Sequence, residues 1–130
     1  MRSKNGKFIL DTSAIIAVLK KEKGYKVIEE IIGSSCISSV NLSELVSVLV
    51  RLKVNEVDEL ITDLVPDVID FDEKIGIEAG KLSKITKDYG LSLGDRACIA
   101  TGICYGMKIY TTDKVWASID EIKSSIVLIR

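Results

Sequence analysis

The sequence predicts an α/β domain in which helices cover both faces of a parallel sheet. Short apolar runs alternate with longer helical patterns along all 130 residues, and this alternation is typical of a parallel sheet. Hydrophobic residues make up 47% of the chain, as expected when a sheet is buried on both faces. No internal repeat, low-complexity tract or linker interrupts the pattern, so we expect residues 1–130 to form a single domain.

Five short apolar runs predict the strands of this sheet. They comprise residues 7–10, 36–38, 68–71, 109–111 and 126–129. Between the runs, apolar residues recur every three or four positions, which is the spacing of a helix with one buried face. That spacing predicts a helix over residues 57–64, ended by Pro66, and a long helix that starts at the N-cap Asp72 and closes at Gly90.

A helix of a different kind is predicted over residues 42–52. Its leucines and valines leave almost no polar face, so we expect it to be buried on more than one side. Burial inside one small domain accounts for this composition. An interface with a second subunit or a partner protein accounts for it equally well.

The chain contains no histidine. This excludes Ser-His-Asp and Cys-His nucleophiles, His-ligated zinc and His acid–base pairs, and an enzyme of this composition needs carboxylates, Lys, Tyr, hydroxyls, thiols or a metal ion. The three cysteines, Cys36, Cys98 and Cys104, form no C-x-x-C pair. We therefore expect them to act as small buried hydrophobic residues.

The charge of the chain is nearly balanced, with 18 basic and 19 acidic residues and a formal net charge of -1. Such a balance predicts no strong attraction to nucleic acids or to a membrane surface. Apolar runs such as residues 14–19 are far shorter than the roughly 20 residues of a membrane span. Because Asp11 also splits the first apolar stretch, a signal peptide is not indicated. We expect a cytoplasmic protein.

Four acidic residues are placed where the predicted sheet would bind a ligand. Asp11 and Asp113 follow the first and fourth strands, Glu44 follows the second strand, and Asp95 opens the helix before the fourth. In an open parallel sheet, ligands bind outside the carboxyl ends of the strands. Each acid also has a local explanation: Asp11 as a helix N-cap, Glu44 in a capping box, and Asp95 or Asp113 at a helix N-terminus.

If the four acids converge, their mutual repulsion requires a positive charge among them. An oxygen-only site suits Mg²⁺ or Mn²⁺ rather than zinc, and such an ion would support hydrolysis of a phosphodiester. Hydroxyls beside the acids are candidates to hold water or a carboxylate, although local turn bonding explains them as well. They are Thr12, Ser13, Thr111 and Thr112. Arg96 and Lys114 are candidates to contact a phosphate, with solvated surface charge as the alternative.

Four sequence blocks resemble the PIN domain. They are Leu-Asp-Thr-Ser-Ala at 10–14, Ser-Ser-Val-Asn-Leu-Ser-Glu-Leu at 38–45, Gly-Leu-Ser-Leu-Gly-Asp-Arg-Ala-Cys-Ile-Ala at 90–100 and Ile-Tyr-Thr-Thr-Asp-Lys-Val-Trp at 109–116. The blocks occur in the order of the family and extend over most of the chain. More narrowly, they resemble the VapC-type ribonuclease toxins of type II toxin–antitoxin systems.

The resemblance implies a three-layer α/β/α sandwich with a five-stranded parallel sheet in the order 3-2-1-4-5. It implies an endoribonuclease dependent on Mg²⁺ or Mn²⁺, with Asp11 and Asp95 as the most direct metal ligands and Glu44 and Asp113 completing the cluster. It also implies a homodimer, a cognate VapB-like antitoxin, and structured RNA, often tRNA, as substrate. The alternative is a non-catalytic PIN-like module that binds RNA or a protein without cleavage.

Overall fold

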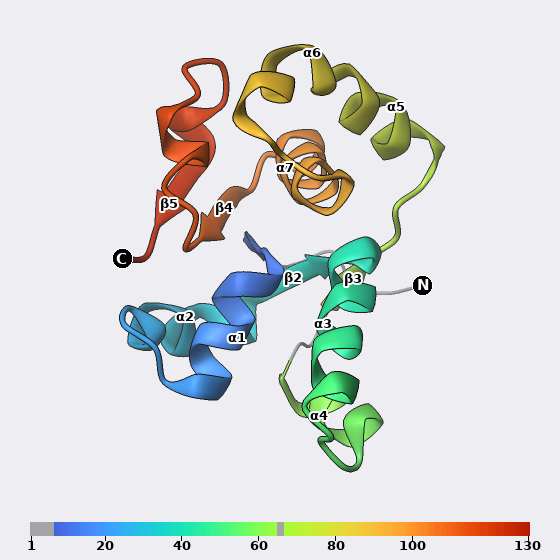
Figure 1. Cartoon of the computed structure of the whole chain (residues 1–130), viewed down its shortest axis with the longest axis vertical. Helices are drawn as coiled ribbons and strands as arrows, with labels where there is room; N and C mark the ends of the chain where they lie inside the picture. Colours follow the sequence, from blue (N-terminus) through green and yellow to red (C-terminus); the bar gives the residue numbers. More distant parts are fainter. Residues whose placement is uncertain (1–6, 65–66) are drawn as a thin grey trace.

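The computed structural model describes residues 7–64 and 67–130 (Figure 1). Its strands are β1 (Phe8–Leu10), β2 (Ser35–Ser38), β3 (Asp67–Ile69), β4 (Lys108–Thr111) and β5 (Ile126–Leu128). Its α-helices are α1 (Thr12–Lys20), α2 (Tyr25–Ile31), α3 (Ser39–Arg51), α4 (Val57–Leu64), α5 (Glu73–Lys81), α6 (Ser83–Thr86) and α7 (Leu93–Tyr105). The five predicted strands form close to their expected bounds. Pro66, predicted to end the helix before β3, lies outside the described residues.

Short 3-10 turns complete the described chain. They are η1 (Ile32–Ser34), η2 (Lys87–Tyr89), η3 (Trp116–Ser118) and η4 (Lys123–Ser125). The strands pair only in parallel, in the order β3-β2-β1-β4-β5. This order confirms the predicted fold class, and it places β1 at the centre of the sheet.

Consecutive strand residues face opposite sides of the sheet, and this alternation separates two cores. In β1, Ile9 packs among residues of α5 and α7, while Leu10 packs among residues of α1, α2 and α3. Cys36 and Ile37 of β2 divide in the same way. The result is a three-layer α/β/α sandwich, with α5, α6 and α7 above the sheet and α1 to α4 below it in Figure 1.

The prediction of one long helix between Asp72 and Gly90 is wrong. Asp72 does cap α5, since its side chain accepts a hydrogen bond from the Ile75 backbone N–H, but the helix breaks at Leu82 into α5, α6 and η2. At the break the Leu82 carbonyl accepts from the Ile85 backbone N–H at 3.1 Å and from the Thr86 hydroxyl at 2.9 Å, and the first of these bonds has the three-residue spacing of a tighter turn. Gly90, with φ of 71°, ends the segment in the left-handed region as expected.

Burial of residues 42–52 on more than one side within the domain, the first of the two explanations for their composition, is also wrong. Within α3, Leu45 and Leu49 are buried on the side that faces the sheet, while Val50 is 59% exposed and Leu52, just after the helix, is 54% exposed. The sequence pattern failed because apolar residues occupy both the inner and the outer side of this helix. The outer ones are available for contacts with another molecule.

Cys36 and Cys98 are buried as predicted, whereas Cys104 is only half-buried; the three cysteines are not joined by disulfides. No helix within the described parts of the chain is long and apolar enough to cross a membrane.

Candidate active site

A pocket of about 650 Å³ opens at the carboxyl ends of the strands, beside β1 and β4. We call it the acidic basin. Its lining residues are Asp11, Thr12, Ser13, Ile16, Asn41, Glu44, Ser47, Val48, Arg51, Asp95, Thr112 and Asp113. Because α1, which follows β1, and α7, which precedes β4, lie in different layers, this is the point where the sheet order reverses and where such sheets bind ligands. The four predicted acids are all present there, together with Thr12, Ser13 and Thr112.

Asp11 lies at the centre of the acidic basin and is fixed by three hydrogen bonds. Its Oδ1 accepts from the Ser13 hydroxyl at 2.7 Å and from the Ala14 backbone N–H at 2.9 Å. Its Oδ2 accepts from the Thr111 hydroxyl at 2.8 Å. A carboxylate offers about four acceptor sites, so one site on Oδ2 remains for water, a cation or a substrate proton.

The backbone explains why the sequence places Asp11 there. Residue 11 leaves β1 with extended geometry and caps α1 through the Ala14 N–H. Asp11 therefore caps α1 and lines the acidic basin at the same time, so the two explanations of this residue are not alternatives. Burial raises the pKa of Asp11 to about 6, against the lowering effect of its hydrogen bonds.

Hydroxyl groups connect the end of β1 to the end of β4. Thr111, which is fully buried, donates to Asp11 and accepts from the Asp113 backbone N–H at 3.0 Å. Ser13 donates to Asp11 and accepts from the Thr112 backbone N–H at 3.2 Å. These bonds fix the turn that carries Asp113 relative to Asp11.

Glu44 reaches the acidic basin from α3. Its Oε1 accepts from the Thr12 hydroxyl at 3.0 Å and from Asn41 Nδ2 at 2.9 Å. Asn41 Nδ2 also donates to the Gly94 carbonyl at 3.1 Å, which ties α3 to the first turn of α7. The helix begins after Ser38, so Asn41 and Glu44 do not form the capping box considered from the sequence. The Glu44 side chain lines the acidic basin instead.

Asp95 and Asp113 contribute the remaining carboxylates. Asp95 forms a capping box with Ser92 at the start of α7: its Oδ2 accepts from the Ser92 backbone N–H at 3.0 Å. Asp113 Oδ1 accepts from the Val115 backbone N–H at 3.0 Å. Each of these side chains keeps one carboxylate oxygen without a hydrogen bond to any described residue.

The electrostatics show that the acids influence one another. Burial raises the pKa of Asp95, and the nearby charges of Asp113 and Glu44 raise it further. The charge of Asp95 also contributes to the raised pKa of Asp11. Mutual repulsion of this kind favours binding of a cation, because a cation lowers the cost of ionising all the carboxylates together.

The donor set of the acidic basin consists of carboxylate, hydroxyl and amide oxygens, which suits a hard cation such as Mg²⁺ or Mn²⁺. Within residues 7–64 and 67–130, no three Asp, Glu, Cys or His side chains form a group arranged to hold a metal ion. The four carboxylates therefore line one basin without forming a closed set of ligands. The residues present fit such an ion by their chemistry.

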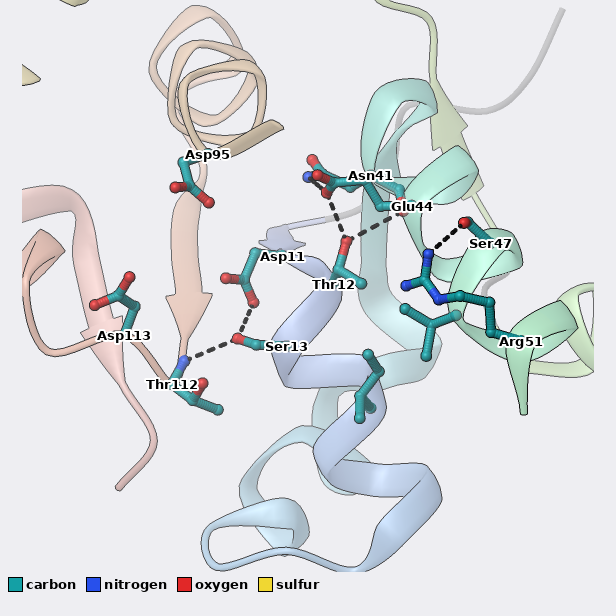
Figure 2. Close-up of a pocket in the computed structure, with 12 residues that line it drawn as sticks. Asp11, Thr12, Ser13, Asn41, Glu44, Ser47, Arg51, Asp95, Thr112 and Asp113 are labelled. Carbon is teal, nitrogen blue, oxygen red and sulfur yellow. Dashed lines mark hydrogen bonds between the residues drawn. The ribbon is translucent and has the colours of Figure 1, made fainter. Parts of the chain in front are cut away.

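Two lining residues were not anticipated from the sequence. Ser47 and Arg51 lie three and seven residues after Glu44, so the three side chains share one face of α3 and point into the acidic basin (Figure 2). The helical spacing 44, 47, 51 is visible in the sequence. This polar face was not recognised because most of the other residues in the segment are leucine or valine, which indicated an apolar helix.

The two cations proposed from the sequence do not line the acidic basin. Arg96 donates from Nη1 to the Ala79 carbonyl at 3.1 Å, near the end of α5. Adjacent residues of a helix point about 100° apart, so Arg96 cannot follow Asp95 into the pocket. Lys114 is exposed and also lies outside the lining.

A model of the PIN domain family matches residues 8–122 of the sequence. The chain belongs to the PIN domain family. No curated protein matches this PIN domain significantly. The family match extends over β1 to η3 and contains the four carboxylates of the acidic basin.

Solved structures resemble this PIN domain over nearly its whole length. A toxin–antitoxin complex from Klebsiella pneumoniae has a TM-score of 0.74 at 15% identity, over 95% of this chain and 98% of that one. DNA-bound VapBC from Salmonella typhimurium has a TM-score of 0.72 at 22% identity, over 96% and 99%. VapBC-5 from Mycobacterium tuberculosis has a TM-score of 0.61 at 22% identity, over 95% and 97%. At these identities the likeness establishes the fold.

Proposed function

We propose that this PIN domain is a metal-dependent endoribonuclease of the VapC toxin type. The observation that carries the proposal is the convergence of Asp11, Glu44, Asp95 and Asp113, from four separate segments, on one basin. Membership of the PIN family and the likeness to toxin–antitoxin structures support it. The absence of histidine is consistent with hydrolysis that depends on carboxylates and a metal ion.

Asp11 and Asp95 would be the most direct ligands of Mg²⁺ or Mn²⁺, and Glu44 and Asp113 would complete the site. Asp11 offers the free acceptor site on Oδ2, and its other sites are filled by Ser13, Ala14 and Thr111. Those bonds prevent the buried carboxylate from turning away. Such preorganisation reduces the entropy lost when a substrate and its cation bind.

When bound, Mg²⁺ or Mn²⁺ would orient a water molecule toward phosphorus and stabilise negative charge on the phosphate. In the hydrolysis, the water oxygen forms a bond to phosphorus and the bond to the leaving ribose oxygen breaks. A carboxylate of the acidic basin accepts the proton of the attacking water, and the leaving ribose oxygen takes up a proton from solvent. Asp113 keeps an oxygen without a hydrogen bond to a described residue, which supports it in this role.

The partner of this PIN domain would be a VapB-like antitoxin, and its substrate would be RNA, with tRNA as the first to test. An apolar groove of about 230 Å³ lies next to the acidic basin and shares Ile16 and Val48 with it. Leu19, Leu52 and Leu60 also line this groove. An antitoxin segment with an apolar side would bury these residues and cover the entrance of the basin.

The test compares four proteins on total tRNA: the wild type, Asp11→Asn, Asp95→Asn and Asp72→Asn. Asp72 caps α5 as Asp11 caps α1, but it lies outside the acidic basin, so Asp72→Asn is the matched control. With Mg²⁺ or Mn²⁺, we expect the wild type and Asp72→Asn to cleave. The two basin variants should lose roughly a hundredfold in rate.

A chelator should abolish cleavage by the wild type. Equal cleavage by the wild type and both basin variants would refute the metal-site mechanism. If the wild type binds tRNA without cleaving it under any of these metals, the chain is instead the non-catalytic binding module.

A further inference from the structure

Arg51 is a positive group in a basin otherwise charged by carboxylates. It is the last residue of α3, and among the described residues no other Lys or Arg lines the acidic basin. Figure 2 shows its guanidinium directed from α3 toward Thr12 and Glu44. None of the ion pairs among the described residues involves Arg51.

The guanidinium is held in place without being saturated. Its Nη1 donates to the Ser47 hydroxyl at 3.0 Å, one turn earlier on α3. A guanidinium has five N–H donors, so this bond leaves most of them available. A positive group that is anchored, exposed and free of carboxylate partners is suited to bind an anion from solution.

The position of Arg51 determines which anion it would meet. Asp95 and Asp113 lie on the opposite side of the basin from Arg51, with Asp11 between them (Figure 2). A phosphate undergoing hydrolysis would lie among the acids and their cation. A second phosphate of the same RNA strand would then extend along α3 toward the guanidinium.

We infer that Arg51 binds a phosphate of the RNA backbone next to the one that is cleaved, and that Ser47 positions its guanidinium. The inference rests on the proposed ribonuclease function. It assigns Arg51 to substrate binding, with no part in the bond-breaking step. It also gives a chain of net charge -1 a positive group inside the basin where a polyanion can bind.

A structural role for Arg51 makes a different prediction. Basic residues at the last turn of a helix stabilise it through the helix dipole. Lys81 is the matched control, because it is the last residue of α5 and contacts a side chain one turn earlier, that of Glu78. Both Arg51→Gln and Lys81→Gln remove a positive charge from a helix end. Only Arg51 lines the acidic basin.

Binding is measured first, on the Asp95→Asn chain so that cleavage does not interfere. The probe is a mixed-sequence 12-nucleotide RNA with a 5′ fluorescein, followed by fluorescence anisotropy at several salt concentrations. We expect Arg51→Gln to weaken binding roughly tenfold. It should reduce the slope of log affinity against log salt by about 0.7, the value for one lost phosphate contact on a single strand.

In the same background, Lys81→Gln should leave the affinity and slope unchanged. Arg51→Lys should retain the slope because it keeps the charge. The inference is overturned if Arg51→Gln leaves both affinity and slope unchanged, if Lys81→Gln has the same effect, or if the Asp95→Asn chain does not bind the probe.

Kinetics on total tRNA separate this inference from the function on which it rests. With Asp95 intact, Arg51→Gln should raise KM several-fold with little change in kcat, and its Tm should match that of the wild type. Cleavage by the wild type with an unchanged KM in Arg51→Gln contradicts the Arg51 assignment alone. An inactive wild type contradicts the ribonuclease function itself.

Discussion

At the scale of single residues, Asp11 combines helix capping with a place in the acidic basin. It caps α1, and the residue is only 7% exposed at the centre of the acidic basin. Burial raises its pKa from 3.8 to about 6. The folded chain therefore binds the Asp11 proton more tightly than the unfolded chain does, and this has a consequence for stability.

The direction of the effect on folding stability follows from the difference between the pKa of Asp11 in the folded and unfolded chains. The stability that Asp11 contributes is fully present below pH 3.8 and is lost as the pH rises through about 6. A shift of this size corresponds to about 3 kcal/mol as an upper limit. At pH 7.5 in a chelator, the ionised carboxylate therefore destabilises the folded chain.

We predict that Asp11→Asn raises the Tm in chelator at pH 7.5 by a few degrees, and that the gain disappears near pH 4. The amide can still accept from Ser13 and Ala14, but its NH2 group faces Thr111, which limits the gain. Thermal unfolding followed by circular dichroism measures the difference. Asp72→Asn reports the effect of an amide at an N-cap outside the basin. A lower Tm for Asp11→Asn at every pH would contradict the prediction.

Protonation of Asp11 should also control metal affinity, because a metal ligand must be deprotonated. At pH 5, one unit below the pKa of about 6, only about a tenth of the carboxylate is ionised. Mn²⁺ affinity measured by calorimetry should therefore be roughly tenfold weaker at pH 5 than at pH 7.5. An affinity independent of pH would separate Asp11 from the metal site.

At the scale of elements, the approach of α7 to α3 decides the position of Glu44. A Cβ added at Gly94, in the first turn of α7, would overlap the Glu44 carboxylate. The Asn41 amide bridges the two helices at the same place. Glycine at position 94 thus leaves the space that the Glu44 side chain occupies.

We predict that Gly94→Ala lowers the rate of tRNA cleavage tenfold to a hundredfold, roughly the effect of displacing a catalytic group. The Tm should not fall, because alanine favours a helix and the exposed Glu44 side chain can move aside. Gly80→Ala is the matched control: it lies inside α5 and a Cβ there meets no atom within 4 Å. It should raise the Tm without changing activity. Equal activity of both variants would contradict the positioning of Glu44 by Gly94.

At the scale of the whole molecule, hydrophobic cores on both sides of the sheet hold the elements that line the acidic basin. An apolar surface remains exposed outside these cores. That surface lies on the outer side of α3 and contains Val50, which is 59% exposed, and the half-buried Val46 one turn earlier. A homodimer through this surface would bury both valines. A dimer of this kind would account for the apolar composition of residues 42–52, from which burial on more than one side was predicted.

We predict that the wild-type chain is a dimer by light scattering and that Val50→Lys is a monomer, because a buried lysine charge opposes association. Ile77→Lys is the control, since Ile77 is 54% exposed on α5 in the other helical layer. It should remain dimeric. A monomeric wild type, or dissociation by Ile77→Lys alone, would exclude the α3 surface as the dimer interface.

The sequence by itself predicted the sheet, because two-residue and helical periodicities report which side of an element is buried. It also predicted the four acids of the acidic basin, because residues that follow parallel strands meet at one edge. The strand order came from the family resemblance. The break at Leu82 escaped prediction, since a tighter turn, in which the Ile85 N–H donates to the Leu82 carbonyl, leaves the apolar spacing unchanged.

Only the tertiary structure decided which neighbours of the acids share the basin. Arg96 follows an acid in sequence but donates to Ala79, whereas Arg51 lies far along the chain and enters the pocket. The direction of a side chain depends on contacts between elements that are distant in sequence, such as α7 with α5 and α3 with α7. The positions of the carboxylates follow from their place in the sequence relative to the strands. Which cation lies beside them, Arg51 and not Arg96, depends on how the helices pack.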